Sequence, residues 1–317
     1  MLNARVSGGH AFIKVKKRRK TGSMKIRYAI PALVAAAALA LSGCTSNTEG
    51  EEYVPYDISG VSADDAVVAL LPADIADRGT IKIGINPEYP PNEYKNSKGE
   101  ISGWAVDLAG ALAAKMGLEI EWEDAGFDTI IPKITGGTMD MGSSSFTDNP
   151  ERQKSVDFVN YYEAGVLWAA PLGAEVEPDD ACGLKVAVQA TTFQHTDELP
   201  EKSEACEAAG KDPIEILPYE TQSEATNAVV QGKAAAFTAD SPVTLFAINQ
   251  LSDKIGPSGM TFDVAPYGYP LDKDSELTPA VQAALQSLMD DGTYLAILEY
   301  AGVADGAITT ATINAGG

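Results

Sequence analysis

Histidine and cysteine, the side chains most often used to bind metals or to act as nucleophiles, are scarce in this chain. Its 317 residues hold two histidines, His10 and His195, and three cysteines, Cys44, Cys182 and Cys206. A structural zinc site takes four such ligands at short spacings, which these positions do not supply. A Ser-His-Asp catalytic arrangement would depend on His195, and no Gly-rich phosphate loop follows a predicted strand. The sequence therefore predicts neither a metal site nor a cofactor.

Cys44 ends a segment with the features of a bacterial lipoprotein signal. The basic Met24-Lys25-Ile26-Arg27 precedes an apolar run, which is shorter than the ~20 apolar residues that a membrane-spanning helix needs. Because Leu41-Ser42-Gly43-Cys44 resembles the lipobox, we expect residues 1–43 to be a signal peptide. We expect translation itself to start at Met24. We expect Cys44 to carry a diacylglycerol. A chance cysteine in an Ala-rich signal is the alternative.

The charge of the chain divides at the same place. Of its 23 basic residues, nine lie in 1–43, where there is no acid, so the remainder carries 14 basic and 45 acidic side chains and a formal net charge of −31. A body this acidic repels polyanions, which excludes nucleic-acid binding as a main function. If Cys44 carries the lipid, Cys182 and Cys206 are free to pair in an oxidising compartment. A disulfide between them, or two buried thiols, are the alternatives.

Strands alternate with helices along two blocks, residues 79–170 and 172–265. This order predicts an α/β fold with largely parallel sheets, whose ligands bind at the carboxyl ends of the strands. Residues 45–60 are polar and are expected to be a flexible tether. The expected strands are 80–86, 118–122, 140–144, 156–160, 165–170, 184–189, 214–217 and 234–238; the expected helices are 64–77, 107–116, 127–135, 192–209 with a break at Pro200, 221–230, 241–250, 278–289 and 293–300.

Several separated motifs resemble one known family. They are Arg78-Gly79-Thr80-Ile81-Lys82-Ile83-Gly84, Tyr89-Pro90-Pro91-Asn92-Glu93-Tyr94, Ser143-Ser144-Ser145-Phe146-Thr147-Asp148, Glu151-Arg152, Ala239-Asp240-Ser241-Pro242 and Gly306-Ala307-Ile308-Thr309-Thr310. From about Leu70 to the C-terminus the chain is similar to the family 3 extracellular solute-binding proteins, the amino-acid receptors of ABC importers, in their actinobacterial lipoprotein branch.

The resemblance implies a type II periplasmic-binding-protein-like fold with two α/β lobes and a ligand cleft. Lobe 1 would combine 79–170 with 266–317, and lobe 2 would be 172–265, with crossings near 169–172 and 263–266. Residues 44–78 would form the lipidated tether and a leading helix. Hinge closure on an amino acid would then present the closed form to an ABC permease. We expect a monomeric, lipid-anchored protein on the outer face of the cell membrane.

Two charged residues would bind the ends of a free amino acid. By position in the family motifs, Arg152 corresponds to the carboxylate clamp and Asp240 to the ammonium acceptor. Burying both charges of a zwitterion is costly unless each is matched. The structural alternatives are a surface ion pair of Arg152 with Glu151 or Asp157, and an N-cap role for Asp240.

The remaining site residues also follow from the resemblance. Ser143 and Ser145 would offer polar groups to the ligand while Ser144 points away, and Thr192 and Phe193 would place backbone N–H groups near its carboxylate. Many relatives have Gly-Thr-Thr at this loop, where this chain lacks the glycine. Tyr89 and Phe127 would be aromatic walls, or else core. Further candidates that would face the ligand's side chain are Asn86 and Gln194.

Asn86 is the residue from which we predict the charge of the ligand's side chain. Relatives that bind Lys, Arg or His often have Asp at this position, so a neutral amide favours a polar, not strongly cationic, amino acid. Two other functions stay open. One is a sensor module that presents ligand to a signalling receptor; the other is a dehydratase-like enzyme, for which His195 and Glu88 are the candidate acids or bases.

Overall fold

The computed structural model describes residues 53–317, which lie within the compact unit Ser46–Gly317. The predicted signal peptide 1–43, the start at Met24, the lipidation of Cys44 and the first part of the tether lie outside the described residues. Among the residues described, no helix is long and apolar enough to cross a membrane.

One mixed sheet runs through the described unit, in the order β5-β1-β6-β11-β7-β10-β8-β9, and β12 pairs with β7. A small second sheet contains β2, β3 and β4. The strands are β1 (Thr80–Ile85), β2 (Glu88–Tyr89), β3 (Glu93–Lys95), β4 (Ile101–Ser102), β5 (Glu119–Asp124), β6 (Met141–Gly142), β7 (Val156–Pro171), β8 (Lys185–Gln189), β9 (Glu215–Tyr219), β10 (Ala236–Asp240), β11 (Ile255–Asp272) and β12 (Thr312–Ile313).

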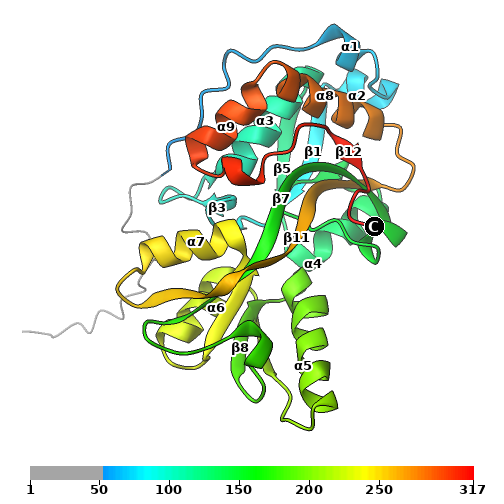
Figure 1. Cartoon of the computed structure of the whole chain (residues 1–317). Coiled ribbons are helices and arrows are strands. Elements are labelled where there is room, and N and C mark those ends of the chain that lie inside the picture. Colours follow the sequence, from blue (N-terminus) through cyan, green and yellow to red (C-terminus); the bar gives the residue numbers. More distant parts are fainter. Residues whose placement is uncertain (1–52) are drawn as a thin grey trace, which may run out of the picture. The chain divides into compact units, whose positions relative to one another are not determined.

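Helices cover both faces of this sheet (Figure 1). The α-helices are α1 (Asp65–Val68), α2 (Ala73–Arg78), α3 (Trp104–Met116), α4 (Phe127–Thr135), α5 (Leu199–Ala208), α6 (Gln222–Val230), α7 (Ser241–Gln250), α8 (Thr278–Asp290) and α9 (Thr293–Ala301). Shorter helical turns are η1 (Arg152–Lys154), η2 (Pro178–Asp180) and η4 (Ala304–Gly306), and η3 (Gln194–Glu198) is a π-helix.

Two groups of parallel strands are joined by an antiparallel ribbon. β1 pairs in parallel with β5 and β6, and β8 pairs in parallel with β9 and β10. The long strands β7 and β11 pair with each other along most of their length and extend from one group to the other (Figure 1). We call the group of β1, β5, β6, α1–α4, α8 and α9 the β1 half, and the group of β8–β10 and α5–α7 the β8 half.

This ribbon differs from the predicted elements. The sequence predicts two separate strands over 156–160 and 165–170, whereas the structure has the single strand β7. No strand was predicted where β11 lies. Its polar and Gly-containing stretch lacks a clear alternation, and the pairing shifts register between Ser258 and Phe262 and again before Ala265. Pairing with β7 supplies the order that its own sequence does not indicate.

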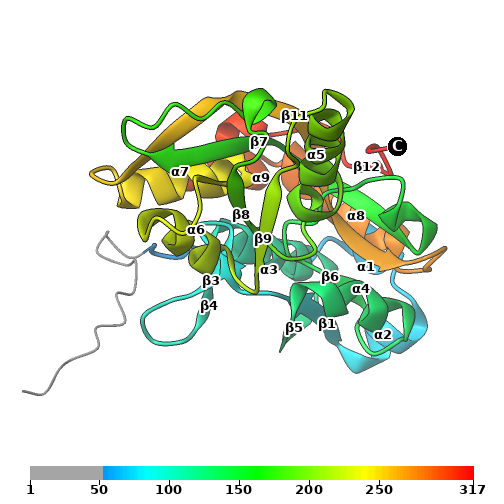
Figure 2. The same ribbon diagram turned by 90° about the horizontal axis from the view of Figure 1, so that it is seen from below.

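In the β8 half, strand β8 shows why successive residues of a parallel strand are all apolar. Val186 and Val188 pack in one cluster with Leu199 of α5, whereas Ala187 packs in another with Ala225 of α6. Successive side chains point to opposite faces, so both faces of β8 need apolar residues. Figure 2 shows α5 and α6 on either side of β8 and β9.

Helix boundaries in this half follow local signals. Thr221 forms a capping box with Glu224 at the start of α6. The predicted helix 192–209 instead begins as the π-helix η3, and α5 starts at Leu199, with Pro200 in its first turn. α5 continues directly from η3, in which the Leu199 amide donates to the Gln194 carbonyl, so the wider turn immediately precedes Pro200, which has no N–H to donate.

The described part of the expected tether, residues 53–60, packs against the β1 half. Tyr53, Tyr56 and Ile58 pack against the main hydrophobic cluster of the β1 half. Asp107 of α3 accepts hydrogen bonds from the Tyr53 hydroxyl and, at 2.8 Å, from the Tyr56 amide. The prediction of a flexible tether is therefore wrong for residues 53–60, because their aromatic side chains bury apolar surface against α3 and α9.

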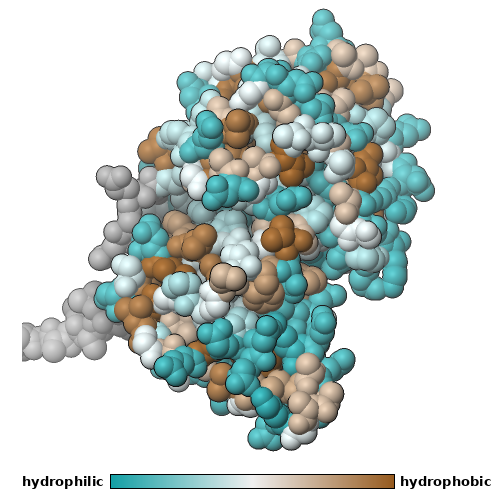
Figure 3. Space-filling model, in the orientation of Figure 1, coloured by the Kyte–Doolittle hydropathy of each residue, from teal (hydrophilic) through white to brown (hydrophobic). Residues whose placement is uncertain are grey.

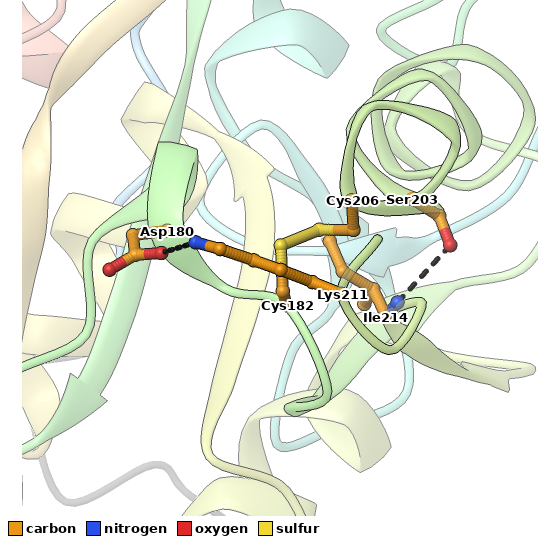
Figure 4. The surroundings of a disulfide bond; sticks show 6 residues. All are labelled: Asp180, Cys182, Ser203, Cys206, Lys211 and Ile214. Carbon is orange, nitrogen blue, oxygen red and sulfur yellow. Dashed lines mark hydrogen bonds and ion pairs between the residues drawn. A yellow bond between two sulfur atoms is a disulfide. The ribbon is translucent and has the colours of Figure 1, made fainter. Parts of the chain in front are cut away.

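A disulfide joins Cys182, just before β8, to Cys206 of α5, with their Cα atoms 5.5 Å apart. Close to it, Lys211 donates to Asp180 at 2.7 Å and the Ile214 amide donates to the Ser203 hydroxyl at 3.1 Å (Figure 4). The bridge therefore ties α5 to the loop that leads into β8.

Candidate functional site

A narrow cavity of about 10 Å³ lies between the two halves. Residues that follow β1, β6, β8 and β10 contribute to it, as expected for the carboxyl ends of strands in an α/β sheet. Its lining residues are Asn86, Tyr89, Glu93, Phe127, Ser144, Ser145, Thr147, Arg152, Gln189, Thr192, Phe193, Gln194 and Asp240. Of the predicted ligand-binding residues, this set contains all but Ser143.

Arg152 projects from η1 and contacts both halves. Its Nη1 donates to the Thr147 carbonyl at 2.8 Å, and its Nη2 donates to the Thr191 carbonyl, in the loop after β8, at 3.2 Å. The guanidinium lies 5.6 Å from the ring centroid of Phe127 and 5.6 Å from that of Phe146. Burial lowers the pKa of Arg152 to about 10, so the group stays cationic at neutral pH. The guanidinium is thus a half-buried cation at the junction.

Asp240 ends β10 and faces the opposite half across the cavity. Its Oδ2 accepts from the Tyr89 hydroxyl at 2.9 Å, and its Oδ1 accepts from Gln194 Nε2 at 2.7 Å. It occupies the N-cap position of α7, but its carboxylate makes no capping hydrogen bond to that described helix. Burial raises its pKa, whereas hydrogen bonds and Arg152 act in the opposite direction. Its carboxylate is therefore directed to the cavity.

The serine loop after β6 differs from its predicted arrangement. Ser144, expected to point away, lines the cavity, and its hydroxyl accepts from the backbone N–H of Asn86 at 3.0 Å. Ser143 is not a lining residue; its hydroxyl is buried without a hydrogen-bond partner among the described residues, and its amide donates to the Gly84 carbonyl. The orientation prediction for Ser144 is wrong because Ser143 continues the pairing with β1. Ser145, at φ 48°, lines the cavity as expected.

Asn86 makes a direct contact between the halves. Its Oδ1 accepts from Gln189 Nε2, at the end of β8, at 3.1 Å, and its own Nδ2 donates to the Ala125 carbonyl at 3.1 Å. The Asn86 amide is therefore already paired on both sides. Its contribution to the cavity is a neutral wall rather than a free acceptor.

Glu93 is a cavity residue to which the sequence analysis assigned no role. Its side chain is fully buried, and its Oε2 accepts from the Ser145 hydroxyl at 2.9 Å. No described residue donates to its other oxygen, Oε1. Burial raises its pKa well above the usual value, and the charge of Asp240 acts in the same direction. Its place in the quoted motif, next to Asn92, was the available signal, but a Glu among polar residues usually lies at the surface.

Thr147 and Gln189 are two further lining residues that the sequence analysis missed. Thr192 closes the loop after β8, where its hydroxyl donates to the Gln189 carbonyl at 2.8 Å. Glu88 and His195, considered for an enzyme, do not line the cavity. Among the described residues, no cluster of His, Cys, Asp and Glu could hold a metal ion.

The comparisons with known proteins agree on one family. The bacterial extracellular solute-binding proteins, family 3, match residues 81–301. The arginine-binding protein ArgT of Corynebacterium glutamicum is 39% identical over 289 residues, which cover 89% of this chain and 93% of that protein. This chain belongs to family 3 of the bacterial extracellular solute-binding proteins. It is a solute-binding receptor rather than an enzyme, and its family functions outside the cytoplasm.

Solved structures confirm the predicted periplasmic-binding-protein fold of this solute-binding protein. An ancestral arginine-binding protein bound to arginine is 31% identical, with a TM-score of 0.65, and covers 70% of this chain and 97% of its own. An ancestral arginine-binding protein bound to glutamine is 32% identical, with a TM-score of 0.64, and covers 71% of this chain and 99% of its own.

Proposed function

We propose that this solute-binding protein captures a free L-amino acid with a basic side chain, arginine first, for an ABC importer. The observation that carries the proposal is the set of ionisable groups in one cavity, which Arg152 lines together with the carboxyl groups of Asp240 and Glu93. A zwitterion needs one buried cation and one buried anion, and the second carboxylate leaves a negative charge for a cationic side chain.

The ends of the ligand would be bound as the family motifs imply. A guanidinium has five N–H donors, so Arg152 keeps donors for a ligand carboxylate beyond its bonds to Thr147 and Thr191. Asp240 would accept from the ammonium group, and the ring of Phe127 would form one wall. Ser145 and the backbone at Thr192 and Phe193 would add polar contacts.

Glutamine is the second candidate ligand. The paired amides of Asn86 and Gln189 present a neutral, polar surface, which supports the sequence-based expectation of a ligand that is not strongly cationic. The protonated form of Glu93 would also leave the cavity without its extra charge. Ancestral arginine-binding proteins are solved with arginine bound and with glutamine bound, which supports keeping both amino acids as candidates.

Calorimetric titration of the purified protein with L-arginine and L-glutamine tests the site. Arg152→Ala and Asp240→Ala should each weaken binding of the preferred amino acid by about a hundredfold or more, because each leaves an unmatched charge. Glu151→Ala is the matched control, since this exposed neighbour of Arg152 pairs with Lys154. Affinity like that of the unmodified protein in either site variant would refute the proposal.

We also propose that capture proceeds by hinge closure of the two lobes at the predicted bounds, with the β7–β11 ribbon as the hinge. The cavity contacts come from both halves, so they form together only when the halves are close. A diacylglycerol on Cys44 would hold the protein at the outer face of the membrane, near its permease. Small-angle scattering should show a smaller radius of gyration when the amino acid is added.

A further inference from the structure

Thr191 adopts a backbone conformation that threonine rarely takes. Its φ is 64°, in the left-handed region, where a β-branched side chain is crowded. It stands in the loop between β8 and η3. Such outliers persist only when surrounding contacts impose them, and they cluster at functional sites.

All the polar groups of Thr191 are engaged. Its amide donates to His195 Nδ1 at 3.0 Å, its carbonyl accepts from Arg152 Nη2 at 3.2 Å, and its hydroxyl donates to the Ala190 carbonyl at 2.7 Å. In the first of these bonds the Thr191 N–H is the donor and His195 Nδ1 is the acceptor. A chain of contacts therefore runs from His195 to the N–H of Thr191, and from the carbonyl of the same residue to the guanidinium of Arg152.

This chain fixes Arg152 from the β8 half. The guanidinium also donates to Thr147 in the β1 half, so it lies between two carbonyl groups that belong to different halves. Rotating the Thr191 peptide out of the left-handed region would remove its carbonyl from Arg152. His195 lies on η3, four residues along the chain, and its ring opposes that rotation.

We propose that His195 is a positioning residue for Arg152. It holds the backbone N–H of Thr191, so that the carbonyl of Thr191 orients the guanidinium toward the ligand. This inference rests on the proposed role of Arg152 as the partner of the ligand carboxylate. His195 itself does not touch the ligand. If His195 only stabilised the loop, ligand affinity would not depend on whether the side chain at position 195 has an acceptor atom at the place of Nδ1.

Three substitutions separate these roles, measured by calorimetric titration with L-arginine and L-glutamine. Asn places its Oδ1 at the distance of Nδ1 from the backbone, whereas Gln places its polar atoms one bond further away. His195→Ala and His195→Gln should each weaken binding of the preferred amino acid by about tenfold, the effect of one lost hydrogen bond to a positioned group. His195→Asn should restore most of the affinity. Equal loss in the Ala and Asn variants, or no loss in the Ala variant, would overturn the proposal.

The backbone strain gives a second, independent test. Glycine adopts a positive φ freely, so in a Thr191→Gly background the loop no longer depends on His195 to keep its shape. The roughly tenfold cost of His195→Ala should then fall below about threefold in this background. An unchanged cost in the two backgrounds would show that His195 does not act through the Thr191 peptide.

The outcome for Arg152 separates this inference from the proposed function. If Arg152→Ala retains full affinity, the proposed function fails whatever the histidine variants do. If Arg152→Ala abolishes binding while the His195 variants bind normally, the proposed function stands and the inference about His195 is refuted. Thermal unfolding without ligand, run on every variant, identifies any loss that comes from misfolding.

Discussion

Glu198 is a buried carboxyl group that the ligand cavity does not use. Its Oε1 accepts from the indole Nε1 of Trp168 at 2.7 Å, and its Oε2 accepts from the Thr238 hydroxyl at 2.8 Å. Burial raises its pKa to about 7, which these hydrogen bonds and Lys202 partly oppose. The group therefore binds a proton in the folded protein at pH values where it is ionised in the unfolded chain.

This difference predicts how stability depends on pH. Because the folded pKa is raised, the contribution of Glu198 is complete below the unfolded pKa and is lost as pH rises through about 7. Glu198→Gln keeps an acceptor for Trp168 and removes the titration. Between pH 5 and pH 8, the free energy of unfolding of the unmodified protein should fall by up to roughly 3 kcal/mol more than that of the variant. Urea unfolding at both pH values measures it; parallel pH profiles would contradict the prediction.

Glu93 should make arginine binding depend on pH. Its pKa is raised by burial and by Asp240, and a cationic ligand side chain would favour its ionised form. Affinity for L-arginine should therefore rise between pH 5.5 and pH 8, whereas affinity for L-glutamine should change less. Glu93→Gln should remove this rise and weaken arginine binding by about tenfold at pH 8. Calorimetry at both pH values decides; a rise that persists in the variant would assign the titration to another group.

At the scale of elements, the disulfide is the covalent link between α5 and the loop before β8. The two cysteines are separated by 24 positions. Replacing both with alanine should lower the free energy of unfolding by about 3–4 kcal/mol, because the unfolded chain regains the entropy of the open loop. Denaturant unfolding of the oxidised protein and the double variant measures the loss. Ligand affinity should stay within about twofold, since the bridge lies outside the cavity lining.

Elements that are specified by a local sequence pattern could be predicted, whereas elements that depend on pairing with a distant strand could not. β1 was predictable because Ile81, Ile83 and Ile85 alternate and are fully buried, and α3 because its apolar residues repeat at helical spacing and end at Gly117. β11 was not, since its pairing with β7 determines its conformation. The π-helix η3 was also missed; its ordinary helical sequence gives no sign of the wider turn.

At the scale of the molecule, three pairs of side chains or backbone groups join the halves around the cavity. They are Asn86 with Gln189, Tyr89 with Asp240, and Arg152 with the Thr191 carbonyl. These bonds connect the two halves directly, so each would favour the closed form in the proposed hinge motion. Figure 3 shows hydrophilic side chains over much of the visible face, in keeping with the acidic composition.

Removing one of these bonds should shift the balance between open and closed forms. Gln189→Ala deletes the Asn86 contact, and we expect it to weaken amino-acid binding by about three- to tenfold. The ligand-free variant should have a larger radius of gyration by small-angle scattering, while its thermal unfolding changes little. Unchanged affinity together with an unchanged radius would show that this contact does not contribute to closure.

The sequence by itself determined the family, the α/β class and most of the charged residues of the site. Arg152, Asp240 and Tyr89 could be named because they stand in recognisable motifs, each defined by its neighbours along the chain. Only the tertiary structure brought Tyr89 to Asp240, 151 positions apart, buried Glu93 beside them, and aimed the Thr191 carbonyl at Arg152. Motifs record local sequence, whereas charge balance in a cavity and backbone strain depend on how two distant segments pack against each other.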